Sequence, residues 1–161
     1  MASNDSYMPQ SVDPGALLDR AQRYCAGAEH CPADVAQLLA RYGATREQTD
    51  KVIGILVQQG YLDSARYCRA FVHDKVAFQA WGRTKIAMGL RAKHLPETCI
   101  QEALQEIDAD QYADNIRKLL QSKRGQDKPR IVRFMLQRGF TFDDLRRYTD
   151  DTNYDDYEND N

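Results

Sequence analysis

The fold of this 161-residue chain is decided by three similar stretches, Asp34-Val-Ala-Gln-Leu-Leu-Ala-Arg-Tyr-Gly-Ala44, Lys85-Ile-Ala-Met-Gly-Leu-Arg-Ala-Lys-His-Leu95 and Arg130-Ile-Val-Arg-Phe-Met-Leu-Gln-Arg-Gly-Phe140. Each has the apolar spacing of an amphipathic helix, and each then reaches a turn residue: Gly43, His94 or Gly139. Recurrence at positions 34, 85 and 130 indicates a repeat of about three helices. A repeat array usually offers a surface that binds something long.

Apolar spacing outside these stretches is also helical. Hydrophobic residues make up 42% of the chain and charged residues 29%, which is enough to bury a core. Nowhere do β-branched and aromatic residues alternate with polar ones over a useful length, as they would in strands. We therefore predict an all-α fold, arranged as an elongated tandem array of three three-helix repeats.

The repeats are predicted between two polar ends. The boundaries are a flexible leader over residues 1–15, repeats over 16–62, 63–109 and 110–148, and an acidic disordered tail over 149–161. Within the first repeat, Thr45-Arg-Glu-Gln48 has the spacing of a capping box that begins a helix. The inner face of that helix is expected to carry Val52, Ile53, Leu56 and Val57.

Charge is distributed unevenly along the chain. The formal net charge is −2, yet the segment from Tyr148 to Asn161 holds six acids and no Lys or Arg. The body of the protein is therefore basic and its tail acidic, a distribution expected of a protein that binds nucleic acid or another polyanion. A solvated tail that aids solubility is the alternative interpretation.

Residues with enzymatic or metal-binding chemistry do not form a recognisable pattern. His30, His73 and His94 fall in different predicted elements, and the chain lacks a glycine-rich phosphate loop. Cys25 and Cys31 flank His30 without zinc-ligand spacing or an evident fourth ligand. We expect neither catalysis nor a cofactor or metal. Because the chain shows no signal peptide and no long apolar run, a cytoplasmic protein without membrane contact is predicted.

Two runs of basic residues are the best candidates for a binding surface. Lys75 to Leu95 contains no acid, and Arg117 to Arg138 contains only Asp127. Basic side chains at this density can neutralise phosphates or meet an acidic protein surface. The candidate residues are Arg83, Lys85, Arg91, Lys93, Lys128, Arg130 and Arg133. Trp81 precedes the first basic helix, where it either stacks on a base or packs the corner between helices.

The central repeat resembles the RecX family of bacterial recombination regulators. The residues that carry the resemblance are Gly60-Tyr-Leu-Asp63, Ala65-Arg66, Gly82-Arg-Thr-Lys-Ile86, Leu90-Arg-Ala-Lys93 and Leu95-Pro96. The chain departs from the family pattern at Ser64, Thr84 and His94, where Asp, Pro and Gly are common. The resemblance implies a non-enzymatic modulator of the RecA recombinase, which binds along the groove of the RecA–single-stranded DNA filament.

Three hypotheses follow. The first is a monomeric regulator, and specifically an inhibitor, of RecA in recombination, DNA repair and the SOS response, with the seven basic residues contacting the filament. The second is a stand-alone helical-repeat protein that binds single-stranded or double-stranded DNA, and the third is a helical scaffold for another protein. Salt-sensitive DNA binding without any dependence on RecA would favour the second.

Overall fold

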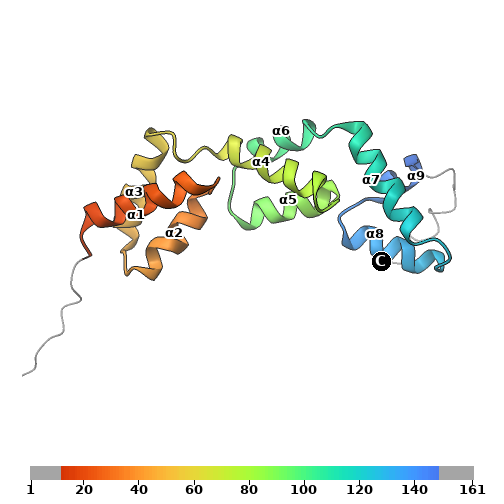
Figure 1. The fold of residues 1–161 in the computed structure, drawn as a ribbon, viewed down its shortest axis with the longest axis horizontal. Coiled ribbons are helices and arrows are strands. Elements are labelled where there is room, and N and C mark those ends of the chain that lie inside the picture. The colour runs from red at the N-terminus through yellow and green to blue at the C-terminus, as the bar shows by residue number, and fades with distance from the viewer. Residues whose placement is uncertain (1–11, 149–161) are drawn as a thin grey trace, which may run out of the picture. The chain divides into compact units, whose positions relative to one another are not determined.

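The computed structural model describes residues 12–148, and every regular element within this range is an α-helix. The helices are α1 (Pro14–Gly27), α2 (Pro32–Arg41), α3 (Arg46–Gln58), α4 (Ser64–Ala77), α5 (Arg83–Ala92), α6 (Glu97–Gln105), α7 (Ala109–Ser122), α8 (Lys128–Gln137) and α9 (Phe142–Tyr148) (Figure 1). The predicted all-α fold of three-helix repeats is thereby confirmed. The acidic tail lies outside the described residues, and the boundaries of the repeats stay a prediction.

The chain divides between Asp63 and Ser64 into two compact units. The described part of the first unit is α1 to α3, whose core contains Leu17, Val35, Leu39 and Leu56. Helix α1 begins inside the segment predicted as a leader, because the Asp13 side chain accepts hydrogen bonds from the first backbone amides of the helix.

The third helix bears out its predicted start but not its whole predicted face. Thr45 and Gln48 exchange side-chain-to-backbone hydrogen bonds of 3.2 and 2.9 Å, as a capping box requires. Val52 and Leu56 are buried, and Ile53 packs against them. The expectation for Val57 is wrong, since its side chain is 52% exposed. Val57 directly follows Leu56, and one residue of helix turns a side chain by about 100° away from the core.

The three similar stretches end in the same backbone motif. In α2, α5 and α8 the backbone amide of the second residue beyond the C-cap donates a hydrogen bond to the carbonyl five positions earlier. Examples are Ala44 N to Leu39 O (3.2 Å) and Phe140 N to Met135 O (3.1 Å). This Schellman closure needs a left-handed residue just before that amide. Gly43 and Gly139 supply it with φ of 75° and 90°, and His94 takes the same conformation at φ 57°.

The second unit begins with α4, α5 and α6, which surround a core of their own. Its fully buried side chains include Cys68, Ile86, Leu90 and Ile100. Helices α7, α8 and α9 enclose another cluster, centred on Tyr112, Met135, Phe140 and Leu145. Thr141 and Asp144 cap α9 by exchanging hydrogen bonds of 2.9 and 3.1 Å.

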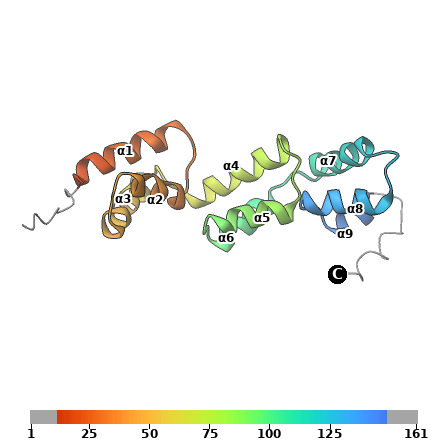
Figure 2. The same cartoon turned by 90° about the horizontal axis from the view of Figure 1, so that it is seen from below.

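Helices α5 and α8 lie end to end within the second unit (Figure 1, Figure 2). The Gly82 amide donates to the Arg138 carbonyl (2.7 Å), and the Thr84 amide donates to the Gly139 carbonyl (3.1 Å). Carbonyls at the C-terminal end of α8 thus accept hydrogen bonds from amides at the N-terminal end of α5, and the macrodipoles of the two helices meet with opposite partial charges. We call this contact the α8–α5 joint.

Side chains from α7 hold the joint from one side. The Tyr112 hydroxyl accepts a hydrogen bond from the Arg83 amide (3.1 Å) and donates one to Asp144 Oδ2 (3.2 Å). Burial, as the largest cause, raises the pKa of the Tyr112 phenol well above its ordinary value, so the hydroxyl keeps its proton. Asn115 donates to the Val76 carbonyl at the end of α4 (2.8 Å). The α4–α6 and α7–α9 groups are therefore tied by both backbone and side-chain hydrogen bonds.

His94 provides a test of the shared helix ending. A left-handed conformation strains any residue with a Cβ atom, whereas glycine adopts it freely. His94→Gly should therefore raise the free energy of unfolding by about 1 kcal/mol in urea denaturation. His94→Ala is the matched control, and it should give no gain because alanine keeps the strain. Equal stability of the two variants would contradict this explanation.

Candidate binding surface

The predicted binding residues sit on the outward faces of α5 and α8. Ile86, Ala87 and Leu90 bury one side of α5, and Val132 and Met135 bury one side of α8. The helical period leaves the intervening cations outside the core. The structure accordingly places all seven predicted residues at exposed or half-buried positions: Arg83, Lys85, Arg91, Lys93, Lys128, Arg130 and Arg133.

On α5 these cations divide between two sides of the helix. Arg83 and Arg91 line a hollow of about 510 Å³ together with Thr84 and the α6 side chains Gln101 and Gln105. The guanidinium of Arg83 lies over the Tyr112 ring, with Cζ 4.1 Å from the centroid. Stacking of this kind fixes the guanidinium plane while its edge stays available for hydrogen bonds. The hollow is therefore lined by donors that suit an anionic oxygen.

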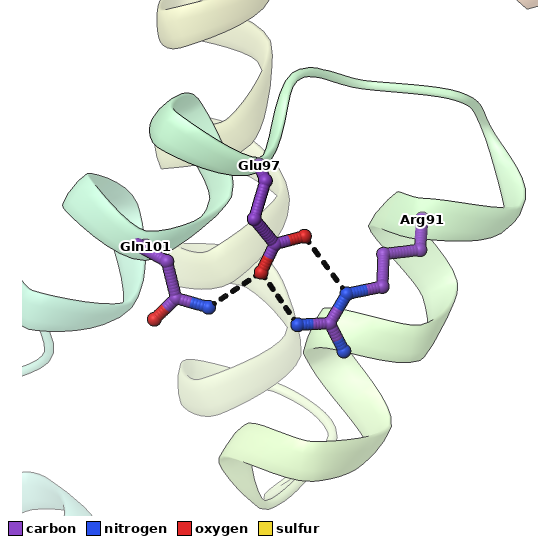
Figure 3. A network of polar contacts seen from close by, with 3 residues as sticks. All are labelled: Arg91, Glu97 and Gln101. Carbon is purple, nitrogen blue, oxygen red and sulfur yellow. Dashed lines mark hydrogen bonds and ion pairs between the residues drawn. The ribbon is translucent and has the colours of Figure 1, made fainter.

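Arg91 is engaged in a polar network rather than standing alone (Figure 3). Its Nε donates to Glu97 Oε2 (2.9 Å), its Nη2 donates to Glu97 Oε1 (2.6 Å), and Gln101 donates to the same Oε1 (2.7 Å). The hydrogen bond from Arg91, followed by that from Gln101, lowers the pKa of Glu97 to about 2. Glu97 thus offsets part of the positive charge that Arg91 would bring to a binding surface.

Lys85 lies on the other side, over the indole ring of Trp81. Its Nζ is 4.3 Å from the ring centroid, and the Nζ of Lys75 is 4.7 Å from the same centroid. Lys93 is more distant from an aromatic ring, with Nζ 5.8 Å from the centroid of Tyr67. Trp81 is half-buried, so it both packs the corner between α4 and α5 and keeps part of its ring accessible.

The α8 residues have different surroundings. Arg130 Nε lies 3.2 Å from Asp127 Oδ1, so the single acid of this basic run pairs with one of the predicted residues. Arg133 is exposed, and Lys128 is half-buried at the start of the helix. The structure therefore groups Arg83 with Arg91, and it places Lys85 and the α8 residues apart from them.

Another cluster of cations and aromatic rings was missed by the sequence reasoning. Lys123 Nζ lies 4.3 Å from the ring centroid of Phe134, and the Arg138 guanidinium carbon lies 5.5 Å from it. Arg138 also donates to the Gln79 carbonyl in the turn after α4. Both cations belong to the basic run recognised in the sequence, but their pairing with Phe134 depends on the loop between α7 and α8 and on the joint.

Histidine and cysteine side chains do not assemble a metal site in the described part of the chain. No three His, Cys, Asp or Glu side chains within residues 12–148 gather closely enough to hold a metal ion. His30 instead stacks on Tyr24, with ring centroids 3.6 Å apart, and the Cys31 thiol contacts Asp34 Oδ2 at 3.3 Å. Within the same residues, no helix is both long and apolar enough to cross a membrane.

These features define a class of protein: tandem three-helix units that carry cations and aromatic rings on their outer faces. The model of the second three-helix domain of RecX matches residues 63–104. The regulatory protein RecX of Halorhodospira halophila is 31% identical over 138 residues, which cover 81% of this chain and 84% of that protein. RecX of Thermus thermophilus is 33% identical over 105 residues, which cover 65% of this chain and 69% of that protein. The chain belongs to the RecX family of regulatory proteins.

Solved structures support the fold independently. A crystal structure of regulatory protein RecX has a TM-score of 0.76 at 19% identity and covers 86% of this chain and 73% of its own. RecX from Lactobacillus salivarius has a TM-score of 0.72 at 15% identity, with coverage of 84% and 93%. At these identities the likeness establishes the arrangement of helices, and function must be argued from the residues.

The Arg91–Glu97 pair yields a prediction about pH. The folded-state pKa of Glu97, about 2, is below the ordinary value of 4.5, so the unfolded chain binds this proton more tightly. The stabilisation from the pair is therefore complete above pH 4.5 and is lost as the pH falls towards 2. A carboxyl NMR titration should show a midpoint near 2 in the parent protein and a higher one in Arg91→Gln. A midpoint near 4.5 in the parent would contradict the network.

Proposed function

We propose that this protein regulates the RecA recombinase, and that it does so as an inhibitor that binds along the RecA–single-stranded DNA filament. The observation that carries the proposal is the combination of RecX-family membership with a basic α5 that has no acid among its residues. A basic surface favours a polyanionic partner and speeds encounter with it. The setting we propose is homologous recombination, DNA repair and the SOS response in the cytoplasm.

Several small contacts are sufficient for such a role. The predicted residues are spread over α5 and α8, and several of them already have intramolecular contacts, such as Arg83 with Tyr112, Arg91 with Glu97 and Arg130 with Asp127. Each would add modestly to affinity, but contacts within one compact unit act together once the first has formed. A monomer without cofactor or catalytic chemistry satisfies this proposal, because regulation here requires binding alone.

Binding to DNA without RecA is the alternative function, and the same cations support it. The two functions differ in what they require of RecA. A stand-alone DNA-binding protein would bind DNA in a strongly salt-dependent manner and leave RecA activity unchanged once free DNA is in excess. A filament regulator acts at amounts stoichiometric with RecA.

Inhibition of the cognate RecA tests the proposal. Stoichiometric amounts of the chain should reduce the DNA-dependent ATPase and strand exchange of RecA. The triple variant Lys128→Ala, Arg130→Ala and Arg133→Ala should need roughly tenfold more protein for the same inhibition, which corresponds to about 1.4 kcal/mol of binding free energy. These side chains lie outside the core, so the fold should persist.

The matched control removes the same charge from the first unit. Arg23→Ala, Arg46→Ala and Lys51→Ala change three exposed cations of α1 and α3 and should leave inhibition within about twofold of the parent. If both triple variants lost RecA inhibition to the same extent, the loss would come from the lower net charge and not from the α8 side chains. An unchanged RecA ATPase and unchanged strand exchange at stoichiometric amounts would refute the proposed function.

A further inference from the structure

Two clusters of cations and aromatic rings meet at the α8–α5 joint. Around Trp81, the ammonium groups of Lys75 and Lys85 approach the indole centroid to 4.7 and 4.3 Å. Around Phe134, Lys123 Nζ lies 4.3 Å and Arg138 Cζ lies 5.5 Å from the ring centroid. All six side chains are half-buried, so each is anchored to the fold and also reaches solvent.

The joint places these clusters next to each other. The Arg138 carbonyl accepts the Gly82 amide (2.7 Å), directly after Trp81 in the chain. The Arg138 guanidinium in turn donates to the Gln79 carbonyl, two residues before Trp81. Arg138 therefore contacts both the turn that carries Trp81 and the ring of Phe134. We call the set Lys75, Trp81, Lys85, Arg138, Phe134 and Lys123 the cation–aromatic strip.

The composition of the strip favours one kind of partner. Proteins that bind single-stranded nucleic acid combine basic side chains along the backbone with aromatic rings on which successive bases stack. The strip combines these two kinds of side chain, with two cations at each ring. Its two stretches of sequence hold one acid, Asp127, which pairs with Arg130. Duplex DNA hides the faces of its bases inside the stack, and an acidic peptide offers charge with few flat rings.

We propose that the cation–aromatic strip binds single-stranded DNA, with bases stacked on Trp81 and Phe134 and with phosphates at Lys75, Lys85, Lys123 and Arg138. The ammonium groups that now lie over the rings belong to flexible side chains, so they swing outward to the phosphates as bases replace them. The inference rests on the proposed function for its setting, in which the strand is the one held by the filament. The test contains no RecA, so the two proposals can fail separately.

Trp81 is the single tryptophan of the chain, so its fluorescence reports on the strip without any label. A short oligothymidylate should quench this emission in a saturable manner at low salt. A duplex of the same length and polyglutamate of equal charge should leave the emission nearly unchanged, because neither presents free base faces. Absence of quenching by the oligothymidylate, or equal quenching by duplex or by polyglutamate, would overturn the proposal.

Variants separate stacking from charge. Phe134→Leu should weaken binding of a fluorescein-labelled oligothymidylate at least about fivefold, because loss of one stacked base is expected to cost that much. The matched control is Tyr42→Leu, which removes a ring beneath Arg20 in the first unit and should change affinity less than about twofold. Circular dichroism should show that both variants keep their helices.

The double variant Lys75→Gln and Lys85→Gln keeps Trp81 and so keeps the fluorescence signal. Loss of two phosphate contacts should reduce the salt dependence, expressed as the slope of log affinity against log salt, by about 1.4. Parent-like affinity and slope in this variant, together with parent-like binding by Phe134→Leu, would refute the strip. RecA inhibition without DNA binding by the strip would refute this inference and leave the proposed function standing.

Discussion

The close backbone contact between Gly82 and Gly139 is the constraint on which the second unit depends. A Cβ atom at Gly82 would overlap the carbonyl of Gly139, and one at Gly139 would overlap Lys85. Only residues without side chains let the end of α8 reach the beginning of α5. Because of this approach, two amides at the start of α5 find their acceptors in carbonyls just after α8, so these backbone groups have partners.

The same contact determines which cations act together. It brings Arg138 to the turn that carries Trp81, while Tyr112 holds Arg83 on the side of α5 that lines the hollow with α6. The basic residues of α5 are therefore divided between a polar hollow and a cation–aromatic strip. In the proposed function the partner is a nucleoprotein filament, which presents two chemically different surfaces, and this division would offer a separate surface for each.

The sequence was sufficient for the helices and insufficient for the pairing of their side chains. Local rules predicted the capping box at Thr45 and the turn at His94, since those signals lie within a few residues of one another. The joint could not be predicted, because the partners of Gly82 and Tyr112 are distant in the chain. Likewise, the sequence identified Arg91 and Arg130 as cations, but only the structure showed that carboxylates engage both.

Native-state hydrogen exchange at the joint tests this account most directly. If the joint stays closed in the native protein, the amides of Gly82 and Thr84 should exchange with nearly the same free energy of opening as the buried amide of Leu90 within α5. These amides donate to Arg138 and Gly139, so opening the joint exposes them at once. Fast exchange at Gly82 and Thr84 with full protection at Leu90 would show that the two helices separate independently, and would contradict the account.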